Sequence, residues 1–151
     1  MSLFTSAILT KLERKKIAEA IAEAERHTVG EIRVSIHRRR AWKERRFSLY
    51  DLAVREFHRL GMEKTKHKTG VLLFLCVADK AFQIIADEGI HTRVETDYWN
   101  SLASKLSSHF RERNFCKGIC DIIDEIGKKL QKEFPRNKET GNELSNDVVI
   151  S

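Results

Sequence analysis

Three carboxylates, Glu31, Asp87 and Glu88, are spaced so that the expected sheet would bring them together. Glu31 begins one predicted strand, and the other two follow a strand that runs in the opposite direction, so all three should lie at one edge. Such oxygen ligands suit a hard cation such as Ca²⁺ or Mg²⁺, and two carboxylates could instead act as acid and base. Glu95 and Asp97 follow closely enough to join them. The alternative is structural: Asp87 caps the following turn, and Glu31 pairs with a neighbouring lysine or arginine.

The segment 38–46 carries the densest positive charge of the chain. It holds one acid and six basic residues, namely Arg38, Arg39, Arg40, Lys43, Arg45 and Arg46. Such a segment can bind an acidic protein partner, nucleic acid or anionic lipid, or it can be a solvated loop with a basic bias. Trp42 and Phe47 are interleaved with the basic residues, as in some single-strand binders. Because one loop without a recognised nucleic-acid module is weak evidence, we expect an acidic protein partner rather than nucleic acid.

A second group, Arg38, Arg39, Asp79 and Lys80, should meet at the opposite edge, beyond the carboxyl ends of the first two strands. Open α/β sheets often bind ligands in this place. An aspartate beside basic residues would suit phosphoryl chemistry, as a nucleophile or as a metal ligand. An Asp-Lys pair in a hairpin turn is also common for turn geometry alone, so both interpretations stay open.

Other catalytic or cofactor-binding patterns are absent from the sequence. The histidines show neither HxH nor HExxH spacing, and no Cys/His cluster has the spacing of zinc ligands. P-loop, dinucleotide-binding and nucleophile-elbow motifs do not occur, so we expect no organic cofactor. The three cysteines, Cys76, Cys116 and Cys120, form no CxxC pair and are interpreted as small core side chains. This cysteine usage favours a reducing compartment, and we expect a cytoplasmic protein.

The bulk properties indicate one soluble domain. The chain has 151 residues, 41% of them hydrophobic, which is enough for a core without disulfides. The net charge of +6 is uneven, because residues 1–70 carry +8 and the remainder −2. The longest apolar run, Val71 to Ala78, is far shorter than the roughly 20 residues that a membrane helix needs, so no transmembrane segment is expected. The first ten residues do not resemble a signal peptide.

The elements that must position these side chains follow from hydrophobic periodicity. Apolar residues at helical spacing predict helices over about Thr10–Arg26 and Ser48–Leu60. Two further helices are expected between Thr96, a predicted N-cap, and Pro135, which ends the second of them. The domain is therefore expected over residues 1–135, with 136–151 as a polar, mobile tail.

Three segments are predicted to be strands. Glu31–His37 alternates strictly between apolar and polar residues, which indicates one buried face. Val71–Val77 is apolar throughout, as in a strand that is buried on both faces, and Ala81–Ala86 returns as the second strand of a hairpin. The order α-β-α-β-β-α-α predicts an α/β fold, a three-layer α/β/α sandwich with a small mixed central sheet.

Four strings in this order resemble the TPM-domain family, and in particular its soluble bacterial branch: AEAERHTVGEIRV, FHRLGMEKTKHKTGVLLFL, FQIIADEGIH and GICDIIDEIGKKLQKEFP. The family also includes thylakoid-lumen proteins linked to photosystem II repair. The resemblance implies an α/β/α sandwich and, from some members, calcium binding and weak acid-phosphatase activity, whereas other members look like interaction domains. Two departures are visible: Ser2-Leu3-Phe4-Thr5 lacks the acidic lead-in of the lumenal branch, and Lys80 stands where Arg is common.

Two functional hypotheses result. In the first, the domain binds Ca²⁺ or Mg²⁺ through Glu31, Asp87 and Glu88 and has weak phosphatase-type activity. In the second, it is a non-catalytic interaction module whose basic loop, residues 38–46, binds an acidic protein partner. The sequence does not indicate an oligomeric state.

Overall fold

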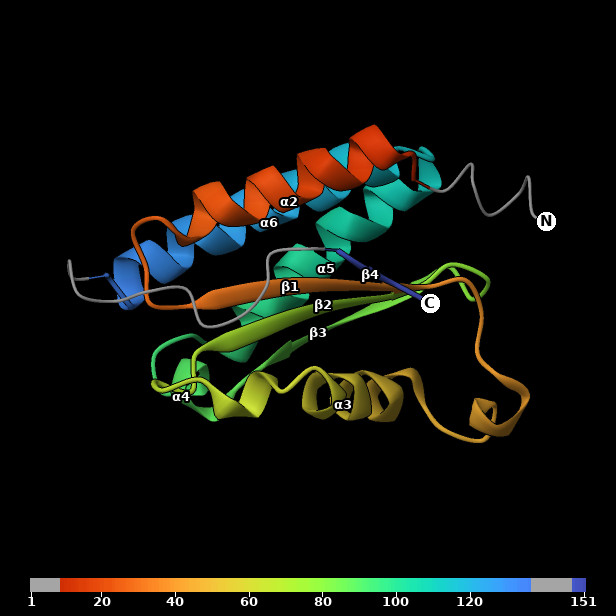
Figure 1. Ribbon diagram of the computed structural model, residues 1–151, viewed down its shortest axis with the longest axis horizontal. Helices are drawn as coiled ribbons and strands as arrows, with labels where there is room; N and C mark the ends of the chain where they lie inside the picture. The colour runs from red at the N-terminus through yellow and green to blue at the C-terminus, as the bar shows by residue number, and fades with distance from the viewer. Residues whose placement is uncertain (1–8, 137–147) are drawn as a thin grey trace.

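The computed structural model describes residues 9–136 and 148–151, which form three layers (Figure 1). Helices α2, α5 and α6 cover one face of the sheet, and α3 covers the other. The elements are α2 (Lys11–Glu25), β1 (Glu31–His37), η1 (Trp42–Glu44), α3 (Leu49–Arg59), η2 (Met62–Lys64), β2 (Gly70–Cys76), β3 (Ala81–Ala86), α4 (Glu88–His91), α5 (Thr96–Arg111), α6 (Phe115–Glu133) and β4 (Val149–Ile150). The predicted α/β/α sandwich is confirmed.

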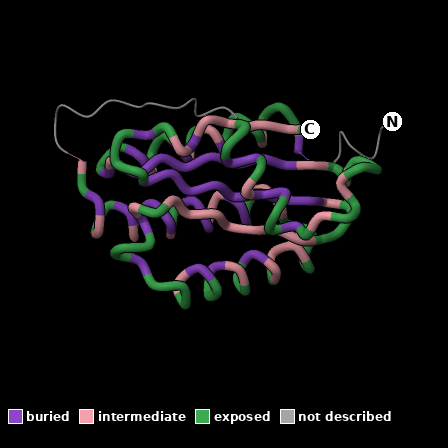
Figure 2. The backbone as a smooth tube through the Cα atoms, turned by 90° about the horizontal axis from the view of Figure 1, so that it is seen from below, coloured by how far each residue is buried: buried purple, intermediate pink, exposed green. Residues whose placement is uncertain are grey.

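The sheet has the order β3-β2-β1-β4. Strands β1 and β2 are parallel and joined through α3, and β3 returns antiparallel to β2 as the predicted hairpin. All residues of β2 are buried, in agreement with its unbroken apolar sequence. Figure 2 shows the two central strands buried over most of their length, whereas the residues of β3 are half-buried.

Side-chain caps fix where several helices begin. Thr10 and Glu13 form a capping box at α2, with both hydrogen bonds at 3.0 Å. Ser48 caps α3 by accepting from the backbone N–H of Asp51. Thr96 differs from its prediction: it is the first residue of α5, and Glu95 occupies the N-cap without a side-chain cap bond.

Besides the 3-10 turns η1 and η2, two short elements were not predicted. Val149–Ile150 forms β4, which pairs in parallel with Ser35 and Ile36 at the free edge of β1. The polar tail expected over 136–151 therefore contributes a strand, although 137–147 lie outside the described residues. Two residues are too few to display alternation, which is why the sequence pattern did not reveal the strand. The second element is the single turn of α4 directly after β3.

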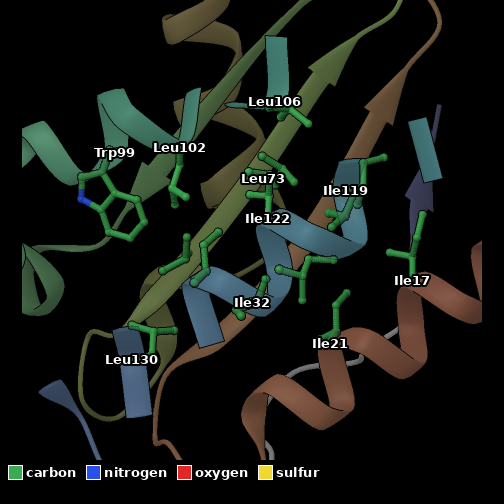
Figure 3. Packing of buried hydrophobic residues seen from close by; sticks show 14 of the residues in the cluster. Ile17, Ile21, Ile32, Leu73, Trp99, Leu102, Leu106, Ile119, Ile122 and Leu130 are labelled. Atoms are coloured by element: carbon green, nitrogen blue, oxygen red, sulfur yellow. The ribbon is translucent and has the colours of Figure 1, made fainter. Parts of the chain in front are cut away.

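The main core lies between the sheet and helices α2, α5 and α6. Figure 3 shows that it interleaves isoleucines and leucines from helices and strands, with Trp99 at one side. The labelled residues are Ile17, Ile21, Ile32, Leu73, Trp99, Leu102, Leu106, Ile119, Ile122 and Leu130. Helices α2 and α6 approach closely at Gly127, where a Cβ atom would lie 2.6 Å from the Cβ of Ala24. A smaller core on the other face lies beneath α3.

Candidate anion-binding pocket

A polar pocket lies on the α3 face, at the carboxyl ends of β1 and β2. Helix α3 packs mainly against β3 and β2 and less against β1. The pocket has a volume of about 320 Å³. Its lining comprises the last residue of each strand, His37 and Cys76, and residues of α3 and of the preceding loop: Arg39, Arg40, Glu44, Leu49, Leu52, Arg55, Glu56 and Arg59, with Phe74 of β2. Open α/β sheets commonly bind ligands at this edge.

The pocket floor is organised by the buried carboxylate of Glu56. Strict alternation in β1 directs Ser35 and His37 to this face, and Glu56 reaches them from α3. The Ser35 hydroxyl donates to Glu56 Oε2, His37 Nε2 lies 3.3 Å from the same oxygen, and the Arg59 guanidinium donates to it at 2.9 Å. Burial by itself would raise the pKa of Glu56, but these hydrogen bonds and the charge of Arg59 outweigh it and hold the pKa well below its usual range.

Two cations of the pocket are left without an acidic partner among the described residues. Arg39 forms no ion pair there, and Arg55 lies over the ring of Phe47, 4.7 Å from its centroid. By contrast, Arg40 Nε binds Asp79 Oδ2 at 2.8 Å, and Arg59 is engaged with Glu56. The pocket, which Glu44 also lines, therefore presents two guanidinium groups that form no ion pair with a described residue, above a floor in which Glu56 is paired with Arg59. Guanidinium groups are well suited to carboxylate and phosphate groups, because their planar donors can bind two oxygens at once.

The six predicted basic residues divide between the pocket and the open surface. Arg39 and Arg40 line the pocket, whereas Arg38, Lys43, Arg45 and Arg46 are exposed beside it and do not. The cations that α3 contributes, Arg55 and Arg59, were not predicted from the sequence. Their separation of four residues places them on one helix face, which was the available signal.

The second group of the sequence analysis, Arg38, Arg39, Asp79 and Lys80, is only partly assembled. Asp79 lies at this edge, but its carboxylate binds Arg40 and accepts from the Cys76 thiol at 3.3 Å. Burial raises the pKa of Cys76, so this residue is a thiol rather than a thiolate at neutral pH and is a weak nucleophile. Neither side chain is arranged as an activated nucleophile.

The three predicted metal ligands lie at the opposite edge of the sheet, as expected, but do not converge. Glu31 pairs with Gly70, and the Asp87 N–H donates to the Gly70 carbonyl, so Gly70 separates the two carboxylates. Glu31 forms a 3.5 Å ion pair with Arg33, and Glu88 is exposed. Asp87 caps α4 by accepting from the Glu88 N–H at 2.8 Å.

The donor set at that edge does not fit a dedicated site for Ca²⁺ or Mg²⁺. Asp87 Oδ2 is buried without a hydrogen-bond partner in the described part of the chain, whereas Asp87 Oδ1 caps α4 and Glu31 is engaged with Arg33. Calcium takes six to eight oxygen ligands, and Mg²⁺ requires near-octahedral geometry. Across residues 9–136 and 148–151, no group of three or more His, Cys, Asp and Glu side chains could hold a metal ion.

The fold and the pocket define the class of protein. It is an α/β domain with an open mixed sheet, one helix on one face and three on the other, and a basic pocket at the carboxyl ends of the parallel strands. Residues 4–129 match the TPM domain, and the chain belongs to the TPM-domain family. Within the described residues, no helix has both the length and the apolar character to cross a membrane.

Solved structures resemble the chain over most of its length. The NMR structure of the BA42 protein from the psychrophilic bacterium Bizionia argentinensis is 36% identical, with a TM-score of 0.86 and coverage of 95% of both chains. The N-terminal domain of a P. gingivalis protein is 15% identical, with a TM-score of 0.70 over 89% of this chain and 85% of the other, and that likeness concerns the fold alone. None of the curated proteins matches the chain.

Proposed function

We propose that this TPM domain is a non-catalytic interaction module that binds a carboxylate or phosphate group of an acidic protein partner in the pocket at His37, Arg39 and Arg55. The observation that carries the proposal is the pair of guanidinium groups, Arg39 and Arg55, that lie above the Glu56 network and form no ion pair with any described residue. Because Ser35, His37 and Arg59 are already held by Glu56, the floor needs little reorganisation when an anion enters.

The pocket's size and surroundings favour a protein ligand. A volume of about 320 Å³ admits one side chain or phosphate group rather than a run of nucleotides. Two large exposed aromatic residues are close in sequence to the lining. Trp42, 79% exposed, is two residues from both Arg40 and Glu44, and Tyr50, 57% exposed, follows Leu49. Tryptophan, tyrosine and arginine are the residue types that contribute most to protein–protein binding energy. A partner that places an acidic side chain in the pocket would cover both aromatics from its flanks.

We expect a fluorescein-labelled deca-glutamate peptide to bind the protein saturably, as measured by fluorescence anisotropy at low ionic strength. The double variant Arg39→Gln/Arg55→Gln should weaken this binding at least about tenfold, since each removed contact is charge-assisted. Lys43→Gln/Arg45→Gln is the matched control, because it removes the same charge from neighbouring exposed residues outside the pocket. The control should change affinity no more than about threefold. An equal loss of peptide affinity in both double variants would mean that the peptide is attracted by the overall positive charge and not by the pocket. Absence of binding by the wild type would refute the proposed anion-binding role of the pocket.

Cation binding with phosphatase-type activity stays a prediction, and the geometry at Glu31, Asp87 and Glu88 gives it little support. From that geometry we expect neither Ca²⁺ nor Mg²⁺ at millimolar concentration to raise Tm by more than about 1 °C over EDTA, because only a ligand with affinity for the folded state stabilises it. The Tm of Asp87→Asn should be equally insensitive to both cations, and the variant should remain folded, since asparagine also caps helices. A saturable rise with one cation that Asp87→Asn abolishes would reinstate the site and justify a phosphatase assay with that cation.

A further inference from the structure

A second cavity, unrelated to the anion-binding pocket, lies on the opposite face of the sheet. It has a volume of about 1000 Å³ and opens between the β2–β3 turn and the connection from α5 to α6. The β2–β3 turn separates the two cavities: Cys76 lines the first, and Val77 and Lys80 line the second. A volume of this size lies at the upper end of the range found for small-molecule sites.

The floor of this second cavity is aromatic. Phe110, at the end of α5, and Phe115, at the start of α6, have ring centroids 5.0 Å apart, and Phe82 meets Phe110 edge-on at 5.8 Å. Both Phe110 and Phe115 are only half-buried, so part of this apolar surface faces the cavity. Covering such surface with an apolar ligand is favourable by about 25 cal/mol for each Å² removed from water.

The rim of the cavity is cationic. Lys80, Arg111 and Arg113 line it, and none of them forms an ion pair with a described residue. The one acidic residue of the lining, Glu13, is engaged in the α2 capping box. The first turn of α6, a helix of 19 residues, adds to the positive potential, because it contains no acid and its N-cap, Asn114, makes no side-chain cap bond.

We infer that this second cavity binds a small amphiphilic carboxylate, such as a medium-chain fatty acid, with its tail on the Phe110–Phe115 floor and its carboxylate among Lys80, Arg111 and Arg113. The inference rests on complementarity. The apolar floor fits an apolar body, and the three cations around it, which form no ion pair with a described residue, fit an anionic head. It is independent of the proposed function, because no residue is shared between the two cavities.

The backbone offers variants that remove the charges without disturbing the fold. Lys80, at φ 49°, and Arg113, at φ 58°, have left-handed conformations, which asparagine adopts more readily than lysine or arginine. Arg113 holds the C′ position of a Schellman motif, where Asn114 N–H bonds to the His109 carbonyl and Arg113 N–H to that of Phe110. Lys80→Asn/Arg113→Asn should therefore fold normally. Lys68→Asn is the matched control, because Lys68 has φ 57° and lies outside the cavity.

The test is a titration of the ¹⁵N-labelled full chain with sodium decanoate, with 1-decanol as the uncharged ligand of equal length. We expect saturable amide shifts at Val77, Lys80, Asn114 and Phe115, at least about tenfold weaker binding of decanol, and a similar loss for decanoate in Lys80→Asn/Arg113→Asn but not in Lys68→Asn. Absence of saturable shifts below about 1 mM decanoate would overturn the inference. So would equal binding of decanol, or undiminished binding by a double variant that is folded by its amide spectrum.

Discussion

Replacing Arg33 by Met is expected to lower the free energy of unfolding by about 3–5 kcal/mol at neutral pH. The Arg33 guanidinium lies between two carboxylates, binding Glu25 at 2.9 Å and Glu31 at 3.5 Å. All three side chains are at most 5% exposed. Methionine fills much of the same volume but leaves two buried carboxylates without the cation between them. The loss is measured by urea unfolding followed by circular dichroism.

The pH dependence of that loss carries additional information. Burial raises the pKa of Glu25, against the opposing charge of Arg33 and the hydrogen bonds that the carboxylate accepts. A carboxyl group whose folded-state pKa is above its unfolded value adds stability below the unfolded pKa, and that stability is lost as pH rises through the folded pKa. Without Arg33 the folded pKa should rise further, so the deficit of Arg33→Met should be larger at pH 8 than at pH 5.

The ion pair between Arg26 and Glu23, at the C-terminal end of α2 where Glu25 also lies, offers a matched control. Arg26 pairs with Glu23 at 3.0 Å, but both side chains are 64% exposed. Arg26→Met should therefore change the free energy of unfolding by less than about 1 kcal/mol, as exposed ion pairs do. An Arg33→Met variant that is no less stable than Arg26→Met, or whose deficit does not depend on pH, would contradict the role given to Arg33.

The second large effect is expected for Glu56→Gln. Glutamine keeps the shape of the side chain but removes the charge that Ser35, His37 and Arg59 bind, and hydrogen bonds to charged groups contribute about 1.5–3 kcal/mol each. We expect a loss of about 2–3 kcal/mol at pH 7. Peptide binding in the anion-binding pocket should weaken as well, because Arg59 and His37 lose the group that positions them.

The contribution of Glu56 to stability changes with pH in the opposite direction to that of Glu25. The pKa of Glu56 is depressed in the folded state, so its stabilisation is present above the unfolded pKa of about 4.3 and is lost as pH falls toward the folded value. The difference in the free energy of unfolding between wild type and Glu56→Gln should therefore become smaller as the pH falls from 5 to 3. Glu23→Gln, at an exposed site, is the control and should leave the pH profile unchanged. A constant gap over this range would show that the Glu56 charge is not what stabilises the pocket floor.

Local patterns in the sequence were sufficient to predict most of the fold. Strict alternation over 31–37 placed Ser35 and His37 on one face of β1, and the unbroken apolar run of β2 placed that strand in the centre of the sheet. The cap residues Thr10 and Ser48 and the stop at Pro135 set helix ends correctly. Strand β4 could not be predicted, because its two residues depend on the free edge of β1 for their pairing.

The candidate site was harder to predict, because it depends on where α3 lies over the sheet. Arg55, Glu56 and Arg59 look in the sequence like the solvated face of an amphipathic helix. Helix α3 lies over β2 and β3, and only this tertiary placement brings the Glu56 carboxylate to His37 of β1 and leaves space for the pocket. At the edge that carries Glu31, Asp87 and Glu88, the strand topology was predicted correctly, but the ion pair between Glu31 and Arg33 was not predicted. Alternation in β1 puts Arg33 on the same face as Glu31, two residues away, and so predicts that the carboxylate is engaged.

The central claim, an anion held by Arg39 and Arg55, is tested most directly by locating the anion. Inorganic phosphate would be titrated into the ¹⁵N-labelled protein at low ionic strength, with arginine side-chain Nε signals followed together with the amides. The account predicts saturable shifts at Arg39, Arg55 and the His37 amide, and loss of the His37 shift in Arg39→Gln/Arg55→Gln. Shifts that do not saturate, or that are confined to the exposed loop residues Lys43, Arg45 and Arg46, would contradict it.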